Sequence, residues 1–245
     1  MAVTFVGAGA IAAGDGVTSL LASTHADTLT GDIIIAQVML KTIDDNIDIS
    51  PPDGSWTEFV TQDLNITNAA GAIHQYACFW KRSTADGAQD FTFTKDSTTG
   101  GFFIVLSSWR GCLASGSPID ATAPGVTETA TNADNVSFPA FDPTLPCHVV
   151  YMAFYGDDNT TFSAAMSADT NPDCTLRYDL ETGTGSDGTL ACISGDSDGS
   201  NIAARTWASN STTNVGNTGV VFGLVPAAAS KIPLFMHHYK LMAAA

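Results

Sequence analysis

The stretch Gly100–Arg110, GGFFIVLSSWR, decides the fold class. Two glycines precede five consecutive apolar residues, Phe102–Leu106, and a third glycine follows at Gly111. A short apolar run that is rich in aromatic and β-branched residues and bounded by glycines is typical of a strand buried on both faces, not of a helix. Burying five such side chains contributes on the order of 10 kcal/mol as an upper estimate, which is enough to organise a domain. The same pattern returns at Gly219–Val225, GVVFGLV.

The composition also indicates an all-β protein. The chain has 245 residues, of which 44% are apolar, so it can bury a substantial core. Glutamate occurs only at Glu58, Glu128 and Glu181, and there are nine lysines and arginines, whereas the turn-forming residues Gly, Ser, Thr, Asn and Asp are abundant. This balance disfavours helices. No apolar run approaches the roughly 18 residues of a membrane helix, so we expect no membrane partner.

Charge and cysteine content exclude further classes. The formal net charge is −16, and residues 1–230 hold 7 bases against 25 acids, or −18. Such a body repels phosphate backbones, so we expect no nucleic-acid partner. The five cysteines are odd in number and form no CxxC pair, which argues against a disulfide framework and against a zinc site. Because the N-terminus also lacks a secretion signal, we expect folding in a reducing cytosol.

The second half of the chain resembles the first. Four pairs of segments match at separations of 112 to 118 residues: Gly31–Leu40 with Pro146–Tyr155, Tyr76–Lys81 with Thr189–Ser194, Asp86–Gly87 with Asp198–Gly199, and Gly101–Ser107 with Gly219–Val225. We therefore predict an antiparallel β-sandwich of jelly-roll type built from two sequence-related halves, about 1–120 and 121–230. A single sandwich spanning residues 1–230 is favoured, and two separate small sandwiches remain the alternative.

The last fifteen residues, 231–245, depart from the strand pattern. They read KIPLFMHHYKLMAAA, which is basic, aromatic and free of acids. Three interpretations stay open: a terminal element docked on its own sandwich, an arm laid against the acidic surface of a neighbouring subunit, or a disordered tail. The second interpretation makes this segment a C-terminal assembly arm. Its candidate interface residues are Leu234, Phe235, Met236, His237 and Tyr239.

Four patterns raise the question of a chemical or binding site. Gly195–Gly199, GDSDG, matches the G-x-S-x-G nucleophile pattern around Ser197, but Gly, Ser and Asn follow it where a hydrolase needs a helix. Acidic loops offer weak calcium candidates: Asp196, Asp198, Asn201, Asp157 and Asp158. Solvated turns explain them better, because the EF-hand spacing is missing.

Trp56 and Trp109 are candidates for glycan contact, although core packing explains most tryptophans. The histidines lack ligand spacing, so no catalytic residue and no cofactor other than calcium is assigned.

Six segments, in their order along the chain, carry a family resemblance: GDIIIAQVML, PPDGSWTEF, YACFWKRS, DFTFT, GGFFIVLSSWRG and PIDA. This ordered set resembles the pattern of phage and bacterial β-sandwich proteins, which are lectin-like jelly rolls serving as virion structural or adhesin modules. The likeness covers roughly residues 28–225. It departs where Ser108–Gly111 replaces A-Y-R-G and where the acidic loop 42–50 is long. The resemblance implies no catalytic residues.

Together these observations predict a bacteriophage virion structural protein, either a head decoration or a tail-associated protein, that is assembled in the host cytoplasm. It would act by assembly and surface presentation and not as an enzyme. Its expected partners are further copies of itself, as a homo-oligomer, and other capsid or tail proteins. The alternative is a carbohydrate-binding adhesin that meets host surface glycans through Trp and Asp loops, with calcium assistance. A glycosidase or esterase is a distant third.

Overall fold

The computed structural model describes residues 2–42, 47–60, 66–67, 73–132, 135–156, 161–163, 166, 172–182, 188–210 and 215–227. All regular elements in these ranges are strands, and every strand pairing is antiparallel. Within the same ranges no helix has the length and apolar content needed to cross a membrane. The predicted all-β, antiparallel fold is confirmed.

Ten strands belong to the first half of the chain: β1 (Thr4–Ala8), β2 (Ala12–Asp15), β3 (Ser19–Ser23), β4 (Ile33–Thr42), β5 (Ile49–Ser50), β6 (Thr57–Val60), β7 (Ile66–Thr67), β8 (Ile73–Arg82), β9 (Asp90–Lys95) and β10 (Gly101–Arg110). Seven belong to the second half: β11 (Gly125–Asn132), β12 (Asn135–Phe138), β13 (Cys147–Tyr155), β14 (Thr175–Glu181), β15 (Thr189–Ser197), β16 (Arg205–Ala208) and β17 (Val215–Leu224).

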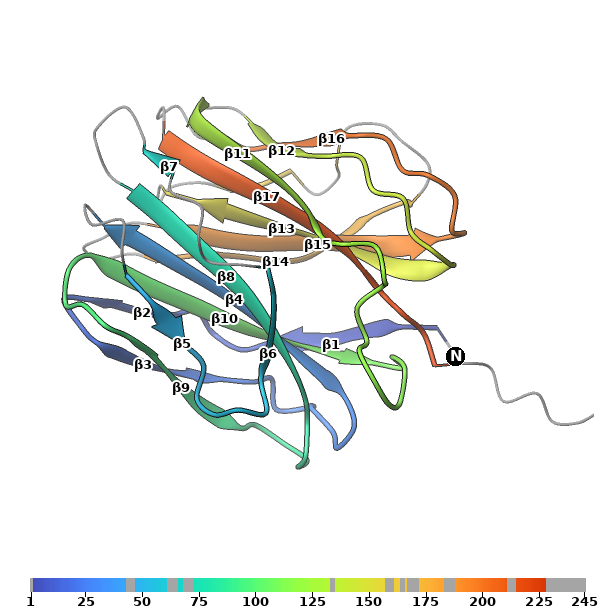
Figure 1. Cartoon of the computed structure of the whole chain (residues 1–245), viewed down its shortest axis with the longest axis horizontal. Coiled ribbons are helices and arrows are strands. Elements are labelled where there is room, and N and C mark those ends of the chain that lie inside the picture. Colours follow the sequence, from blue (N-terminus) through green and yellow to red (C-terminus); the bar gives the residue numbers. More distant parts are fainter. Residues whose placement is uncertain are drawn as a thin grey trace, which may run out of the picture.

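These strands form two large and two small sheets. The first large sheet has the order β1-β10-β4-β8-β6, with β2 also paired to β10 and β7 to β8. The second large sheet has the order β11-β17-β13-β15-β14. The small sheets are β3-β9-β5 and β12-β16. Figure 1 shows them stacked in layers, with the two large sheets in the middle and one small sheet on each outer side.

Three hydrophobic clusters fill the spaces between the layers. The central cluster joins the two large sheets and includes Ile35, Met39 and Val105 from the first half with Val150, Met152 and Phe154 from the second. The two outer clusters join each large sheet to its own small sheet. Because successive side chains of a strand point to opposite faces, β4, β10 and β13 serve a central and an outer cluster at once. This arrangement explains their continuous apolar sequences and confirms that Gly101–Trp109 is buried on both faces.

The two large sheets share one pairing register. Ile33 of β4 lies opposite Arg82 and Trp109 on its two neighbouring strands. The residues 115, 114 and 115 positions further along the chain are His148, Asp196 and Leu224, respectively. In the second sheet His148 lies opposite Asp196 on β15 and opposite Leu224 on β17. The match of Gly31–Leu40 with Pro146–Tyr155 keeps its separation of 115 residues in this register. The matches made on the sequence for Tyr76–Lys81 (113 residues) and Gly101–Ser107 (118 residues) are wrong by one and three residues, so the strand order repeats in the two sheets but those residue-by-residue matches do not.

Glycines at the two ends of β10 allow the main chain to pass close by. Gly100 and Gly111 have φ angles of +74° and +81°, a region that L side chains rarely adopt. A β-carbon on Gly100 would collide with the carbonyl oxygen of Lys41, and one on Gly111 would collide with that of Ala2. The central strand thus begins and ends at positions that only glycine fills without strain.

Candidate functional site

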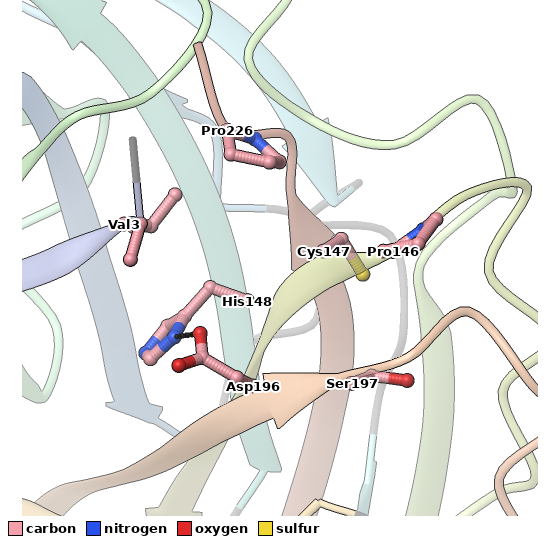
Figure 2. Close-up of a pocket in the computed structure, with 8 residues that line it drawn as sticks. Val3, Pro146, Cys147, His148, Asp196, Ser197 and Pro226 are labelled. Atoms are coloured by element: carbon pink, nitrogen blue, oxygen red, sulfur yellow. Dashed lines mark hydrogen bonds and ion pairs between the residues drawn. The ribbon is translucent and has the colours of Figure 1, made fainter. Parts of the chain in front are cut away.

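A pocket of about 180 Å³ lies at one end of the second large sheet (Figure 2). Its wall combines four segments that are distant in the sequence: Ala2–Val3, Pro146–His148, Asp196–Ser197 and Pro226. Figure 2 shows the side chains of His148 and Asp196 pointing toward each other, with Val3 beside this pair. The pocket therefore gathers the start of the first half and three separate segments of the second half around one ionisable pair.

A continuous chain of hydrogen bonds runs from this pair into the protein. His148 Nδ1 lies 2.7 Å from Asp196 Oδ1, and His148 Nε2 lies 2.9 Å from Ser194 Oγ. Arg177 Nε donates to the same serine oxygen over 2.7 Å. Because the Asp196 carboxylate can only accept, His148 Nδ1 carries the proton, and in the neutral ring Nε2 then accepts from the Ser194 hydroxyl. The imidazole is then the Nδ1–H tautomer, which donates to the Asp196 carboxylate.

The protein environment favours the neutral form of this imidazole. Burial lowers the pKa of His148 below its usual value, and the positive charge of Arg177 lowers it further. The hydrogen bond and charge of Asp196 act in the opposite direction but do not outweigh burial. His148 is therefore held uncharged at neutral pH.

Strand geometry explains how the three side chains meet. Ser194 and Asp196 are two residues apart on β15, so their side chains lie on the same face of the sheet. His148 of β13 is directly opposite Asp196 in the pairing of these two strands. Arg177 reaches the serine from the neighbouring strand β14. The hydrogen bonds consequently tie three adjacent strands together.

Ser194, His148 and Asp196 are hydrogen-bonded in the same order as the serine, histidine and aspartate of a serine hydrolase triad. The serine is buried and the aspartate is exposed, however, which is the reverse of such a triad. A hydrolase needs its serine hydroxyl open to substrate, while the buried aspartate orients the histidine. Here Ser194 is 0% exposed, and the Asp196 side chain is 71% exposed. The serine oxygen is also occupied by Arg177. We interpret this constellation as a link between strands.

Ser197, the serine of the GDSDG pattern, also lines the pocket. It is the last residue of β15, and a bend at Gly199–Ser200 follows it, not the helix of a nucleophile elbow. Its hydroxyl oxygen accepts a hydrogen bond from the Gly199 amide. The expectation of a solvated turn is wrong for Gly195–Ser197, which belong to β15, because their pairing with β13 continues the strand; the turn begins only after Ser197.

Two of the calcium candidates already form hydrogen bonds with other groups of the protein. Asp196 binds His148, and Asp198 Oδ1 accepts hydrogen bonds from the amide and hydroxyl of Ser200. Asn201 follows in the same loop and is exposed. Asp157 and Asp158 lie outside the described residues. Within the described part of the chain no group of three or more His, Cys, Asp or Glu side chains is arranged to hold a metal ion.

Trp56 and Trp109, the two candidates for glycan contact, are both buried, which agrees with the core packing that explains most tryptophans. Trp109 is 0% exposed and packs edge-on against Phe5 in the central cluster. Trp56 is 6% exposed and packs against Phe91 and Phe93 beneath the small sheet. Both rings therefore lie in hydrophobic clusters, Trp109 in the central cluster between the large sheets and Trp56 in the cluster between the first large sheet and its small sheet.

Cys147 is the thiol of the pocket wall. It is 4% exposed, and burial raises its pKa to about 12, so it is a protonated thiol at neutral pH. All five cysteines of the chain are free, and Cys78, Cys112, Cys147 and Cys192 are buried. These four belong to the hydrophobic clusters and pack there as small apolar side chains.

A second hollow, of about 350 Å³, lies between β11, β12 and β16. Its most polar lining residue is Arg205, which is 4% exposed. The guanidinium donates to the carbonyl oxygen of Pro172 over 3.0 Å and lies over the ring of Tyr151. These contacts engage Arg205 in holding the loop before β14 against the sheet.

Sequence reasoning named Asp196 only as a calcium candidate and missed its partnership with His148 and Ser194. One signal was present, since the S-x-D spacing within an expected strand places both side chains on one face. The contribution of His148 depends on the register between β13 and β15, which begin 42 residues apart (147 and 189). The candidate interface residues Leu234, Phe235, Met236, His237 and Tyr239 lie outside the described residues.

These features define an antiparallel, multilayered β-sandwich protein with a small pocket at the end of its second large sheet. Comparison of the chain with protein-family models, with curated proteins and with solved structures found no match.

Proposed function

We propose that this chain is a structural protein of a bacteriophage virion, a head decoration or a tail-associated protein, and that it works by assembling with itself through residues 231–245. Other capsid or tail proteins are its further partners, and assembly takes place in the host cytoplasm. The ordered resemblance of residues 28–225 to phage β-sandwich modules supports the virion assignment.

The observation that carries the assembly proposal is how the last described residues, up to Ala227, are hydrogen-bonded to the rest of the protein. The Leu113 amide donates to the Val225 carbonyl, and the Val225 amide donates to that of Pro118. The Ala227 amide then donates to the Gly111 carbonyl over 2.7 Å. The last described residues, Val225 and Ala227, are thus held by main-chain hydrogen bonds against residues 111–118, which lie between β10 and β11.

Charge provides the second support. The arm carries Lys231 and Lys240 and no acid, whereas residues 1–230 carry a formal charge of −18. A basic, apolar segment rooted on an acidic body is attracted to the surface of another copy, and the attraction falls as salt screens it. Apolar side chains then supply the affinity that charge alone does not.

We also propose that each half is a jelly roll and that both arose from one duplicated unit. In each half the first and last strands of the large sheet are neighbours, as β1 with β10 and β11 with β17. The strands of each small sheet come from between those of the large sheet along the chain. Two packed sheets connected in this manner, repeated with a register offset of about 115 residues, support this interpretation.

The test is a protein that ends at Ser230. We expect the full chain to form a discrete oligomer by light scattering coupled to size-exclusion chromatography, and the truncated chain to be a monomer with an unchanged circular dichroism spectrum. If the truncated chain forms an oligomer with the same number of copies as the full chain does, the proposal is overturned. The position of the coding gene tests the virion assignment separately, since we expect capsid or tail genes beside it.

We do not extend the proposal to the adhesin alternative. Its two candidate contact residues, Trp56 and Trp109, are 6% and 0% exposed and pack within the hydrophobic clusters. A sugar ring stacks only on an aromatic face that it can reach.

A further inference from the structure

We propose that the pocket beside His148 receives Phe235 from a second copy of the chain, so that two copies exchange their C-terminal segments reciprocally. This inference rests on the proposed assembly through residues 231–245, and it adds the surface that binds them and the symmetry of the complex.

The pocket has the size and lining of a site for one aromatic ring. Its volume is about 180 Å³, and a cavity of about 150 Å³ is sufficient to admit benzene in another protein. Val3, Pro146 and Pro226 supply apolar surface around the His148 ring. Among residues 231–245 there is a single phenylalanine, Phe235. An aromatic anchor seated in a pocket is the usual centre of a protein–protein contact.

The pocket lies at the root of the segment that would fill it, where the root means Pro226 and Ala227, the last described residues before that segment. Pro226 is part of the pocket wall, and the next residue, Ala227, is bonded to Gly111. The eight residues from 228 to 235 span at most about 29 Å when fully extended. A compact body of this length is roughly 46 Å across. Phe235 therefore reaches a site close to its own root, or the same region of a neighbour pressed against it.

Because the pocket lies next to the root of the segment, a two-fold symmetric complex is favoured over a head-to-tail one. In a two-fold complex the same patch of both copies meets, so the donor segment and its acceptor must share one face. A head-to-tail ring or fibre instead places donor and acceptor on different faces. Pro226 lines the pocket, so the pocket and the root lie together on one face. The geometry thus fits a closed, reciprocal pair.

The rim of the pocket matches the charge of the segment. The Asp196 side chain is 71% exposed and stands at the rim, with Oδ1 engaged by His148. The incoming segment holds Lys231 four residues before Phe235 and has no acid.

The experiment uses the full chain with the photo-reactive amino acid benzoylphenylalanine at position 235. After irradiation we expect a product of twice the chain's mass, with the cross-link mapping to Ala2–Val3 or Pro146–His148. Filling the pocket rim with Ala2→Trp should remove this product, because Ala2 is exposed and lines the pocket. The matched control is Leu21→Trp, at a 55% exposed residue of β3 on the outer small sheet, which should leave the product unchanged.

A second readout does not depend on the cross-link. Phe235→Ala and Ala2→Trp should each weaken self-association by at least about tenfold in sedimentation equilibrium, with circular dichroism unchanged. A cross-link to the pocket within one chain would overturn the exchange, and a cross-link elsewhere would overturn the pocket. If the protein ending at Ser230 is monomeric while Phe235→Ala and Ala2→Trp associate normally, this inference fails and assembly through the arm stands.

Discussion

Asp32 and Arg110, 78 residues apart, form a two-pronged ion pair between β10 and the residue before β4: Arg110 Nε lies 2.9 Å from Asp32 Oδ1, and Nη2 lies 2.8 Å from Oδ2. The Asp32 side chain is 4% exposed, and it also accepts a hydrogen bond from the Leu29 amide. These residues belong to two of the segments that carry the family resemblance, GDIIIAQVML and GGFFIVLSSWRG. Their pairing gives a physical reason for both segments to occur together.

Removing the arginine should destabilise the fold. Arg110→Ala leaves the Asp32 carboxylate buried without its partner, and we expect a loss of about 2 to 3 kcal/mol in the free energy of unfolding. The loss stays below that of a fully buried pair because the Arg110 side chain is 41% exposed. Arg110→Lys keeps the charge but not the two-pronged geometry, so it should cost about 1 kcal/mol. Urea unfolding measures both, and equal stability of all three proteins would contradict the prediction.

Gln37 joins the two large sheets through polar contacts. Its Nε2 donates to the Ala153 carbonyl over 2.8 Å, and its Oε1 accepts from the Tyr178 hydroxyl over 2.8 Å. Met152 holds the corresponding place in the second half by the offset of 115 residues. Gln37→Met should therefore fit sterically but leave the Tyr178 hydroxyl without this partner, at a cost of about 1 to 3 kcal/mol. Adding Tyr178→Phe should cost less than the sum of the two single changes, and additive effects in denaturant unfolding would argue against the coupling.

Gly100 should tolerate no β-carbon. Gly100→Ala combines a positive φ with a collision against the Lys41 carbonyl, so we expect a loss of about 3 kcal/mol. Gly87 is the matched control, because its φ is +87° but a β-carbon there meets nothing within 4 Å. Gly87→Ala should cost about 1 to 2 kcal/mol, from backbone strain alone. Thermal unfolding of the two variants would refute the argument if their losses were equal.

His148 should make stability fall in mild acid. Burial lowers its pKa in the folded state, so the unfolded chain binds a proton more readily. The corresponding stability is complete above the unfolded pKa of about 6.5 and is lost as pH falls from there toward the lower folded pKa. We expect the wild type to lose more stability between about pH 7.5 and about pH 5.5 than His148→Gln does. Equal pH dependence of the two proteins in urea unfolding would rule out this assignment.

Much of the fold follows from local sequence. The apolar runs of β4, β10, β13 and β17 predict strands because few side chains other than β-branched and aromatic ones pack well on both faces of a sheet. The near-constant separation of matching segments predicts which strands correspond, and the strand order of the two large sheets agrees with it, although two of the matches are displaced by one and three residues from the observed register. Both inferences need only neighbouring residues and their repetition along the chain.

Tertiary structure decided how the layers stack and which polar groups meet. A strand sequence shows that Trp109 points to one face, but only the opposing sheet makes that face the 0% exposed interior and not a binding surface. Ser194 and Asp196 share a face by spacing alone, whereas His148 reaches them through strand register. The pocket similarly needs Val3 and Pro226, which lie at opposite ends of the described chain. Sequence by itself therefore determined the long buried strands, and long-range register and packing determined the contacts between them.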